Sequence, residues 1–127
     1  MTQAAYLLLI EDDDALAGLL ASHLRARGYR VSVAPTAELA QGILATGDHP
    51  DLILLDINLP GETGWTVLRS DSYTAAGRPP VIVASAMSVN PARLREYDVA
   101  GYLPKPFAME TLRSTIERSL HPENEPA

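Results

Sequence analysis

The fold is decided by the stretch LILLDINLPG, residues 52–61. Its first four residues form an unbroken apolar run, which is typical of a strand that is covered on both faces in a parallel sheet. Asp56 follows this run directly. Ligands of open α/β sheets bind at the carboxyl ends of the strands, so Asp56 is a candidate site residue.

Four further apolar runs lie on either side of this stretch, at residues 6–10, 31–34, 81–84 and 102–103. The segments between them have helical spacing. In the first, Leu16, Leu19, Leu20 and Leu24 are predicted to share one buried face, and Gly28 ends the helix. We predict further helices over residues 37–45, 65–72, 109–120 and, from Pro91 at its first turn, through Leu94 to Tyr97.

Alternation of five strands with five helices predicts a doubly wound α/β fold with a five-stranded parallel sheet and right-handed crossovers. A chain of 127 residues fits a single domain. We expect a core over about residues 6–120 and a flexible tail over residues 121–127.

Composition restricts the functions that this chain can have. The formal net charge is −6, which disfavours direct nucleic-acid binding by this domain. Absence of cysteine excludes disulfides, thiolate metal sites and cysteine nucleophiles. The apolar run that ends at Ile10 is too short to span a membrane, so we expect a cytoplasmic protein with no membrane contact.

Four acidic residues, Glu11 to Asp14, follow the first apolar run. We expect Glu11 and Asp12 to lie at the sheet edge, whereas the last two residues serve as the cap and first turn of the next helix. Asp56 then faces Glu11 and Asp12 across neighbouring strands. A carboxylate cluster without histidine or cysteine suits a hard divalent cation, and Mg²⁺ is the natural candidate.

Ser85 follows the fourth apolar run, and Lys105 with Pro106 follows the fifth. Each residue alone is also explained by an ordinary role, a strand-end hydrogen bond for Ser85 and a surface charge for Lys105. Together, a hydroxyl and an ammonium group beside a carboxylate and metal cluster are what the oxygens of a phosphoryl group require.

The ordered set Glu11-Asp12, Asp56, Ser85 and Lys105-Pro106 resembles the receiver domain of bacterial two-component response regulators, and by size its stand-alone CheY-like members. The resemblance covers about residues 6–120. It implies a flavodoxin-like fold with strand order 2-1-3-4-5. It also implies that Asp56 is the phospho-acceptor and that Glu11, Asp12, Asp56 and the backbone carbonyl of Asn58 hold Mg²⁺.

The same resemblance assigns roles to three residues near the fourth and fifth strands. Ser85 and Lys105 would bind the phosphoryl group, and Tyr102 would be the aromatic switch. The Lys105–Pro106 peptide bond is expected to be cis. The implied partners are a sensor histidine kinase or histidine phosphotransfer protein as phosphodonor, and a downstream protein target. The domain would be a signalling phospho-acceptor and not an enzyme, and would catalyse only its own phosphorylation and dephosphorylation.

The sequence departs from the family pattern at several points. The interval from Ser85 to Lys105 is slightly short, and the loss falls around the fourth helix. Ala100 and Gly101 replace a common acidic doublet, so we expect a monomer. We expect a signalling face built from the fourth helix, fifth strand and last helix, because Tyr102 would join these segments to the site. Two alternatives stay open: a degenerate receiver that only docks proteins, and a haloacid-dehalogenase-like phosphatase, whose Asp-x-Asp pattern Asn58 interrupts.

Overall fold

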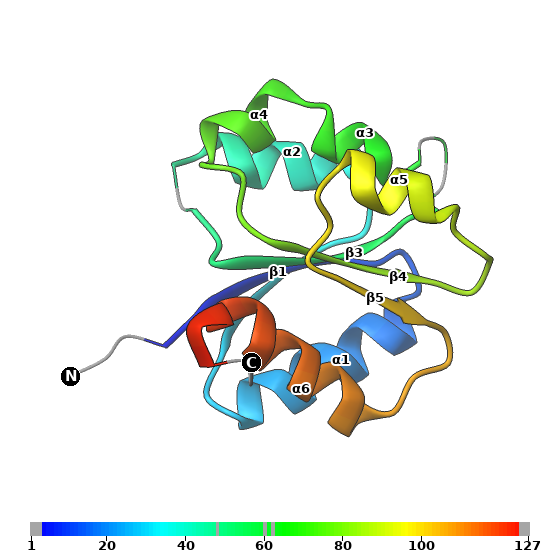
Figure 1. Ribbon diagram of the computed structural model, residues 1–127. Coiled ribbons are helices and arrows are strands. Elements are labelled where there is room, and N and C mark those ends of the chain that lie inside the picture. Colours follow the sequence, from blue (N-terminus) through cyan, green and yellow to red (C-terminus); the bar gives the residue numbers. More distant parts are fainter. Residues whose placement is uncertain (1–3, 48, 60, 62, 125–127) are drawn as a thin grey trace.

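The sheet of the computed structural model has its strands in the order β2-β1-β3-β4-β5, all parallel (Figure 1). The structure describes residues 4–124 apart from 48, 60 and 62, so the last three residues of the predicted tail lie outside it. The strands are β1 Tyr6–Ile10, β2 Arg30–Ala34, β3 Leu52–Asp56, β4 Val81–Ser85 and β5 Gly101–Pro104. The predicted fold class and strand order are confirmed.

Helices cover both faces of the sheet (Figure 1). On one face lie α1 Asp14–Ala26 and α6 Met109–Leu120, and a 3₁₀ helix, η1 Pro122–Asn124, follows α6. On the other face lie α2 Ala37–Ala45, α3 Trp65–Leu68, α4 Asp71–Ala75 and α5 Pro91–Glu96. Among the described residues, no helix has the length and apolar character that a bilayer-spanning segment needs.

Successive residues of the central strands point to opposite faces of the sheet. Leu8 and Ile53 pack in the core beneath α2 and α3, whereas Leu7 and Leu52 pack in the core beneath α1 and α6. All four side chains are buried. The apolar runs of β1, β3 and β4 are unbroken because both faces of these central strands are covered, and polar residues begin where the strands end.

Helix α1 begins within the acidic run. The Asp13 carboxylate accepts a hydrogen bond from the Leu16 N–H at 3.1 Å, and Asp14 lies in the first turn. These charges satisfy a free N–H group and favour the positive end of the helix dipole. The helix ends at Ala26, and Gly28 adopts a φ of 98°, which favours glycine. Both ends of this helix agree with the prediction.

The predicted buried face of α1 is wrong in one respect, because Leu19 is 59% exposed. The residues that face the sheet are Ala17, Leu20, Ala21 and Leu24. The two alanines move the centre of the buried face toward Ala21. A helix has about 3.6 residues per turn, so this orientation turns Leu19 outward.

The predicted single helix over residues 65–72 is also wrong, since α3 and α4 are separate. The Ser70 hydroxyl donates to the Val67 carbonyl at 2.6 Å and accepts from the Tyr73 N–H at 3.2 Å. A serine that bonds the backbone on both sides interrupts the helical ladder and caps a new helix. The described chain therefore has six α-helices where five were predicted.

The remaining predicted helices are found close to their expected positions. Helices α2 and α6 have the predicted bounds. Helix α5 has Pro91 at its start, after the Asn90 side chain, which accepts from the Ala92 N–H at 2.9 Å. It has only six residues, in agreement with the short interval noted in the sequence.

Candidate functional site

Three carboxylates meet at the carboxyl edge of the sheet. Glu11 follows β1 and is 2% exposed, and Asp56 is the last residue of β3 and 6% exposed. Asp12 is exposed beside them. One oxygen from each carboxylate lies within 4.8 Å of the others. The structure thus brings together the acidic residues that the sequence placed at the ends of two neighbouring strands.

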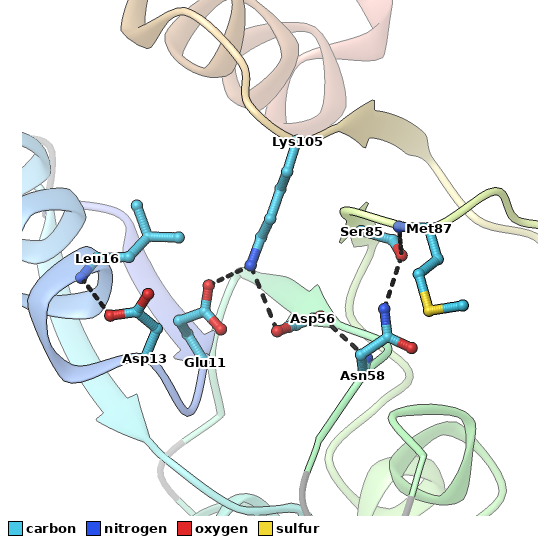
Figure 2. A network of polar contacts seen from close by, with 8 residues as sticks. All are labelled: Glu11, Asp13, Leu16, Asp56, Asn58, Ser85, Met87 and Lys105. Atoms are coloured by element: carbon cyan, nitrogen blue, oxygen red, sulfur yellow. Dashed lines mark hydrogen bonds and ion pairs between the residues drawn. The ribbon is translucent and has the colours of Figure 1, made fainter.

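Lys105 reaches this cluster from the segment between β5 and α6 (Figure 2). Its Nζ donates to Glu11 Oε1 at 2.5 Å and to Asp56 Oδ2 at 3.3 Å. Its backbone N–H donates to the Ser85 carbonyl at 2.8 Å, which ties this segment to the end of β4. The Lys105–Pro106 bond is cis, as predicted.

The site holds more negative than positive charge. Burial and the hydrogen bond with Asp56 together raise the pKa of Glu11 to about 7, although Lys105 acts in the opposite direction. Burial alone would lower the pKa of Lys105, but its hydrogen bond to Glu11 and the charges of both carboxylates outweigh burial and raise it. The single ammonium group of Lys105 therefore does not neutralise the three carboxylates, and a further cation would be attracted to this site.

The residues present fit a hard divalent cation. Glu11 Oε2 is buried and has no hydrogen-bond partner among the described residues, so a buried lone pair is left to accept a cation. Glu11, Asp12 and Asp56 offer oxygen atoms alone, which is the donor set that Mg²⁺ prefers.

Asn58 lies between Asp56 and Ser85 (Figure 2). Its backbone N–H donates to Asp56 Oδ1 at 2.9 Å, and its side-chain amide donates to Ser85 Oγ at 3.1 Å. From the sequence, only the backbone carbonyl of Asn58 was predicted to take part in the site, and this amide contact was not predicted. The available signal was an amide side chain two residues after Asp56, within reach of the next strand end.

Ser85 and Tyr102 are connected through the backbone of Met87. The Met87 N–H donates to Ser85 Oγ at 3.1 Å, and the Tyr102 hydroxyl donates to the Met87 carbonyl at 3.5 Å. Tyr102 lies on β5 and is half-buried against the core beneath α2 and α3. A displacement of the Ser85 hydroxyl therefore acts on a segment that Tyr102 also contacts.

Gly64 is a further residue that the sequence analysis missed. A Cβ atom at this position would lie 2.6 Å from the carbonyl oxygen of Asp56 and 3.0 Å from the Cα of Ile57. The Gly64 N–H donates to the Ile57 carbonyl at 2.8 Å. Only glycine allows the loop to close so tightly on the residue at the end of β3. No local pattern marks this contact, because loop closure creates it.

Gly101 permits a second close approach. A Cβ atom here would lie 2.8 Å from Thr115 Cγ2 on α6. The departure at Ala100-Gly101 therefore has a packing consequence, since the glycine lets α6 lie directly against β5.

Comparisons with known proteins place the chain in a family. A model of the response regulator receiver domain matches residues 7–117. The transcriptional activator protein PfeR of Pseudomonas aeruginosa is 39% identical over 117 residues, covering 90% of this chain and 37% of PfeR. The transcriptional regulatory protein BasR of Escherichia coli is 33% identical over 123 residues, covering 93% of this chain and 53% of BasR. The chain thus spans about a third to a half of these relatives.

Solved structures give the same fold. A CheY-like receiver domain protein from Methanospirillum hungatei has a TM-score of 0.86 at 22% identity, over 94% of this chain and 96% of that one. The HemR receiver domain from Leptospira biflexa has a TM-score of 0.80 at 30% identity, over 91% and 94%. TrrA from Thermotoga maritima, solved in complex with Mg²⁺ and BeF, has a TM-score of 0.78 at 24% identity, over 91% and 98%.

Proposed function

The chain belongs to the response regulator receiver domain family, and we propose that Asp56 is the residue that accepts its phosphoryl group. One observation carries this assignment: the buried Asp56 carboxylate is held at both oxygens, by the Asn58 N–H and by Lys105 Nζ, beside a second buried carboxylate. Such fixing orients one oxygen for in-line attack on phosphorus.

In the proposed transfer, an oxygen of Asp56 forms a bond to phosphorus while the bond from phosphorus to a histidine nitrogen of the donor breaks. Lys105 neutralises charge on the phosphoryl oxygens, and the Ser85 hydroxyl donates to one of them. Mg²⁺, held by Glu11, Asp12, Asp56 and the backbone carbonyl of Asn58, supplies further positive charge when bound. The TrrA complex with Mg²⁺ and BeF supports this choice of cation.

The proposed switch follows from the contacts of Ser85. Ser85 Oγ accepts hydrogen bonds from Asn58 and Met87, so its O–H can donate to a phosphoryl oxygen, and movement toward that oxygen would lengthen the bond from the Met87 N–H. The backbone of Met87 can then shift, and with it the Met87 carbonyl, which accepts a hydrogen bond from the Tyr102 hydroxyl. The state of the site would reach α5, β5 and α6 in this way.

A protein phosphodonor, a sensor histidine kinase or histidine phosphotransfer protein, is supported by an apolar groove that adjoins the site. The groove has a volume of about 480 Å³ and shares Lys105 with the carboxylate cluster. Leu19 and Phe107 line it. Its continuity with the site fits a helical donor surface that presents phosphohistidine to Asp56.

We also propose a downstream protein partner. With net charge −6, the domain would signal to a downstream protein through α5, β5 and α6 rather than bind nucleic acid directly. We propose that it stays monomeric, because Ala100 and Gly101 carry no charge for ion pairs across a dimer. A cytoplasmic location stays a prediction.

The test is incubation with acetyl phosphate and Mg²⁺, followed by intact mass spectrometry. We expect one added phosphoryl group in the wild type and none in Asp56→Asn or in the presence of a chelator. An equal gain in Asp56→Asn would overturn the assignment. No gain in the wild type would favour a docking module, and continuous release of phosphate from many substrates would favour a phosphatase.

A further inference from the structure

Helix α5 is loosely attached to the rest of the domain. None of its six residues is buried, whereas the neighbouring α2 buries Ala37, Ala40 and Leu44. A cavity of about 600 Å³ lies at the carboxyl end of α5, where Glu96 and Tyr97 line it together with Tyr73 of α4. Leu94 of α5 is partly buried against the core beneath α2 and α3, so few apolar contacts fix the position of this helix. The contacts that do hold α5 therefore determine where it lies.

Two directional contacts are made by Tyr97, the residue that caps the carboxyl end of α5. Its ring stacks on Trp65, with 5.0 Å between the ring centroids and 15° between the ring planes. Its hydroxyl accepts a hydrogen bond from Arg69 Nη1 at 3.0 Å. Trp65 begins α3 and Arg69 caps its end. We call Trp65, Arg69 and Tyr97 the aromatic clasp.

The aromatic clasp is joined to the candidate phospho-acceptor by one tight turn. Trp65 directly follows Gly64, which lies against the carbonyl oxygen of Asp56 with no space for a Cβ atom. The Gly64 N–H is also bonded to the carbonyl of Ile57, the residue after Asp56. A displacement of the backbone at Asp56 and Ile57 is therefore passed to the start of α3, and so to the Trp65 ring.

We propose that the aromatic clasp transmits the state of Asp56 to α5, in parallel with the route through Ser85 and Tyr102. The proposal rests on the assignment of Asp56 as phospho-acceptor and adds a second coupling element to it. Trp65 and Arg69 act as positioning residues, because they contact α5 and none of the reacting atoms. The position of α5 would then depend on two routes from Asp56, the aromatic clasp and the contacts of Ser85 and Tyr102.

The test combines intact mass spectrometry with hydrogen exchange of α5, in the absence and presence of Mg²⁺ and beryllofluoride. Tyr97→Leu removes the stack and the hydroxyl contact, whereas Tyr97→Phe removes only the hydroxyl contact. Tyr73→Phe is the matched control, because Tyr73 lines the same cavity and donates to the Pro79 carbonyl, outside the aromatic clasp. Arg69→Met, at an exposed position, serves if Tyr97→Leu does not fold.

We expect beryllofluoride to change exchange across α5 in the wild type and in Tyr73→Phe. In Tyr97→Leu this response should fall at least twofold, with a smaller loss in Tyr97→Phe and in Arg69→Met. The half-saturating beryllofluoride concentration should also move by about 2- to 10-fold in Tyr97→Leu, the factor expected for an aromatic pair. Trp65 is the single tryptophan, so its fluorescence should report the same loss.

Phosphoryl incorporation separates this proposal from the one on which it rests. If Tyr97→Leu takes up phosphoryl groups and keeps the full α5 response, the aromatic clasp plays no part in coupling and the proposal is overturned alone. If the wild type incorporates no phosphoryl group, both proposals are overturned.

Discussion

Replacing Glu11 with glutamine is expected to remove a large part of the pH dependence of stability in the magnesium-free protein. In the folded state the pKa of Glu11 is raised from 4.5 to about 7, chiefly by burial. Between these two values the folded state keeps a proton that the unfolded state has released. Stability is therefore full below about pH 4.5 and falls as the pH rises to about 7.

The size of the effect follows from the two pKa values. Each pKa unit corresponds to about 1.4 kcal/mol, so a rise from 4.5 to about 7 corresponds to about 3 kcal/mol of unfolding free energy. Glutamine carries no charge at any pH and lacks this dependence. At pH 8 the variant should be more stable than the wild type by up to about 3 kcal/mol, and near pH 4.5 the two should be similar.

Urea unfolding with a chelator present, at several values from pH 4.5 to pH 8, measures this difference. With an m-value of about 1–3 kcal/mol/M, the urea midpoints at pH 8 should differ by about 1–3 M. Glu38→Gln is the control, because it removes one exposed carboxylate. Saturating Mg²⁺ should flatten the wild-type dependence by stabilising ionised Glu11. Parallel pH profiles for the wild type and Glu11→Gln would refute the reasoning.

Three further predictions concern single positions. Asp12→Ala should weaken Mg²⁺ binding, measured by calorimetry, more than Asp14→Ala. Equal affinities for the two variants would contradict the assignment of Asp12 to the site and Asp14 to the helix. Gly101→Ala should lower the free energy of unfolding, measured by thermal denaturation, by about 1–3 kcal/mol, because the added Cβ atom meets Thr115. Thr115→Ser should restore most of this loss, and no loss in Gly101→Ala would show that α6 moves away freely. Tyr102→Ala should leave phosphoryl incorporation nearly unchanged but weaken partner binding; a matching loss of incorporation would contradict its place downstream of the chemistry.

Much of the fold could be predicted because the local signals are strong. The run at residues 52–55 and the acidic run after Ile10 each mark the end of a strand, and both ends are found where expected. The errors arose where packing decides. Leu19 fits the apolar spacing but points outward, and the helix over residues 65–72 breaks at Ser70, whose hydroxyl competes with the helical ladder.

The candidate site was predictable as a set of residues but its contacts were not. Glu11 and Lys105 are 94 positions apart, and only the folded sheet places Lys105 Nζ 2.5 Å from Glu11 Oε1. The contact of Gly64 with the Asp56 carbonyl likewise depends on how one loop closes. Side-chain partners at such separations follow from tertiary geometry, which no local sequence pattern contains.

The absence of buried residues in α5 also affects how this surface can evolve. Substitutions at Arg93, Arg95 or Glu96, all exposed, change its charge pattern without disturbing the core. Surface changes of this kind usually alter stability by no more than about 0.5 kcal/mol. If partners bind α5 as proposed, their choice is thus free to diverge between related chains, or to be redesigned, while the proposed phosphorylation site at the sheet edge stays intact.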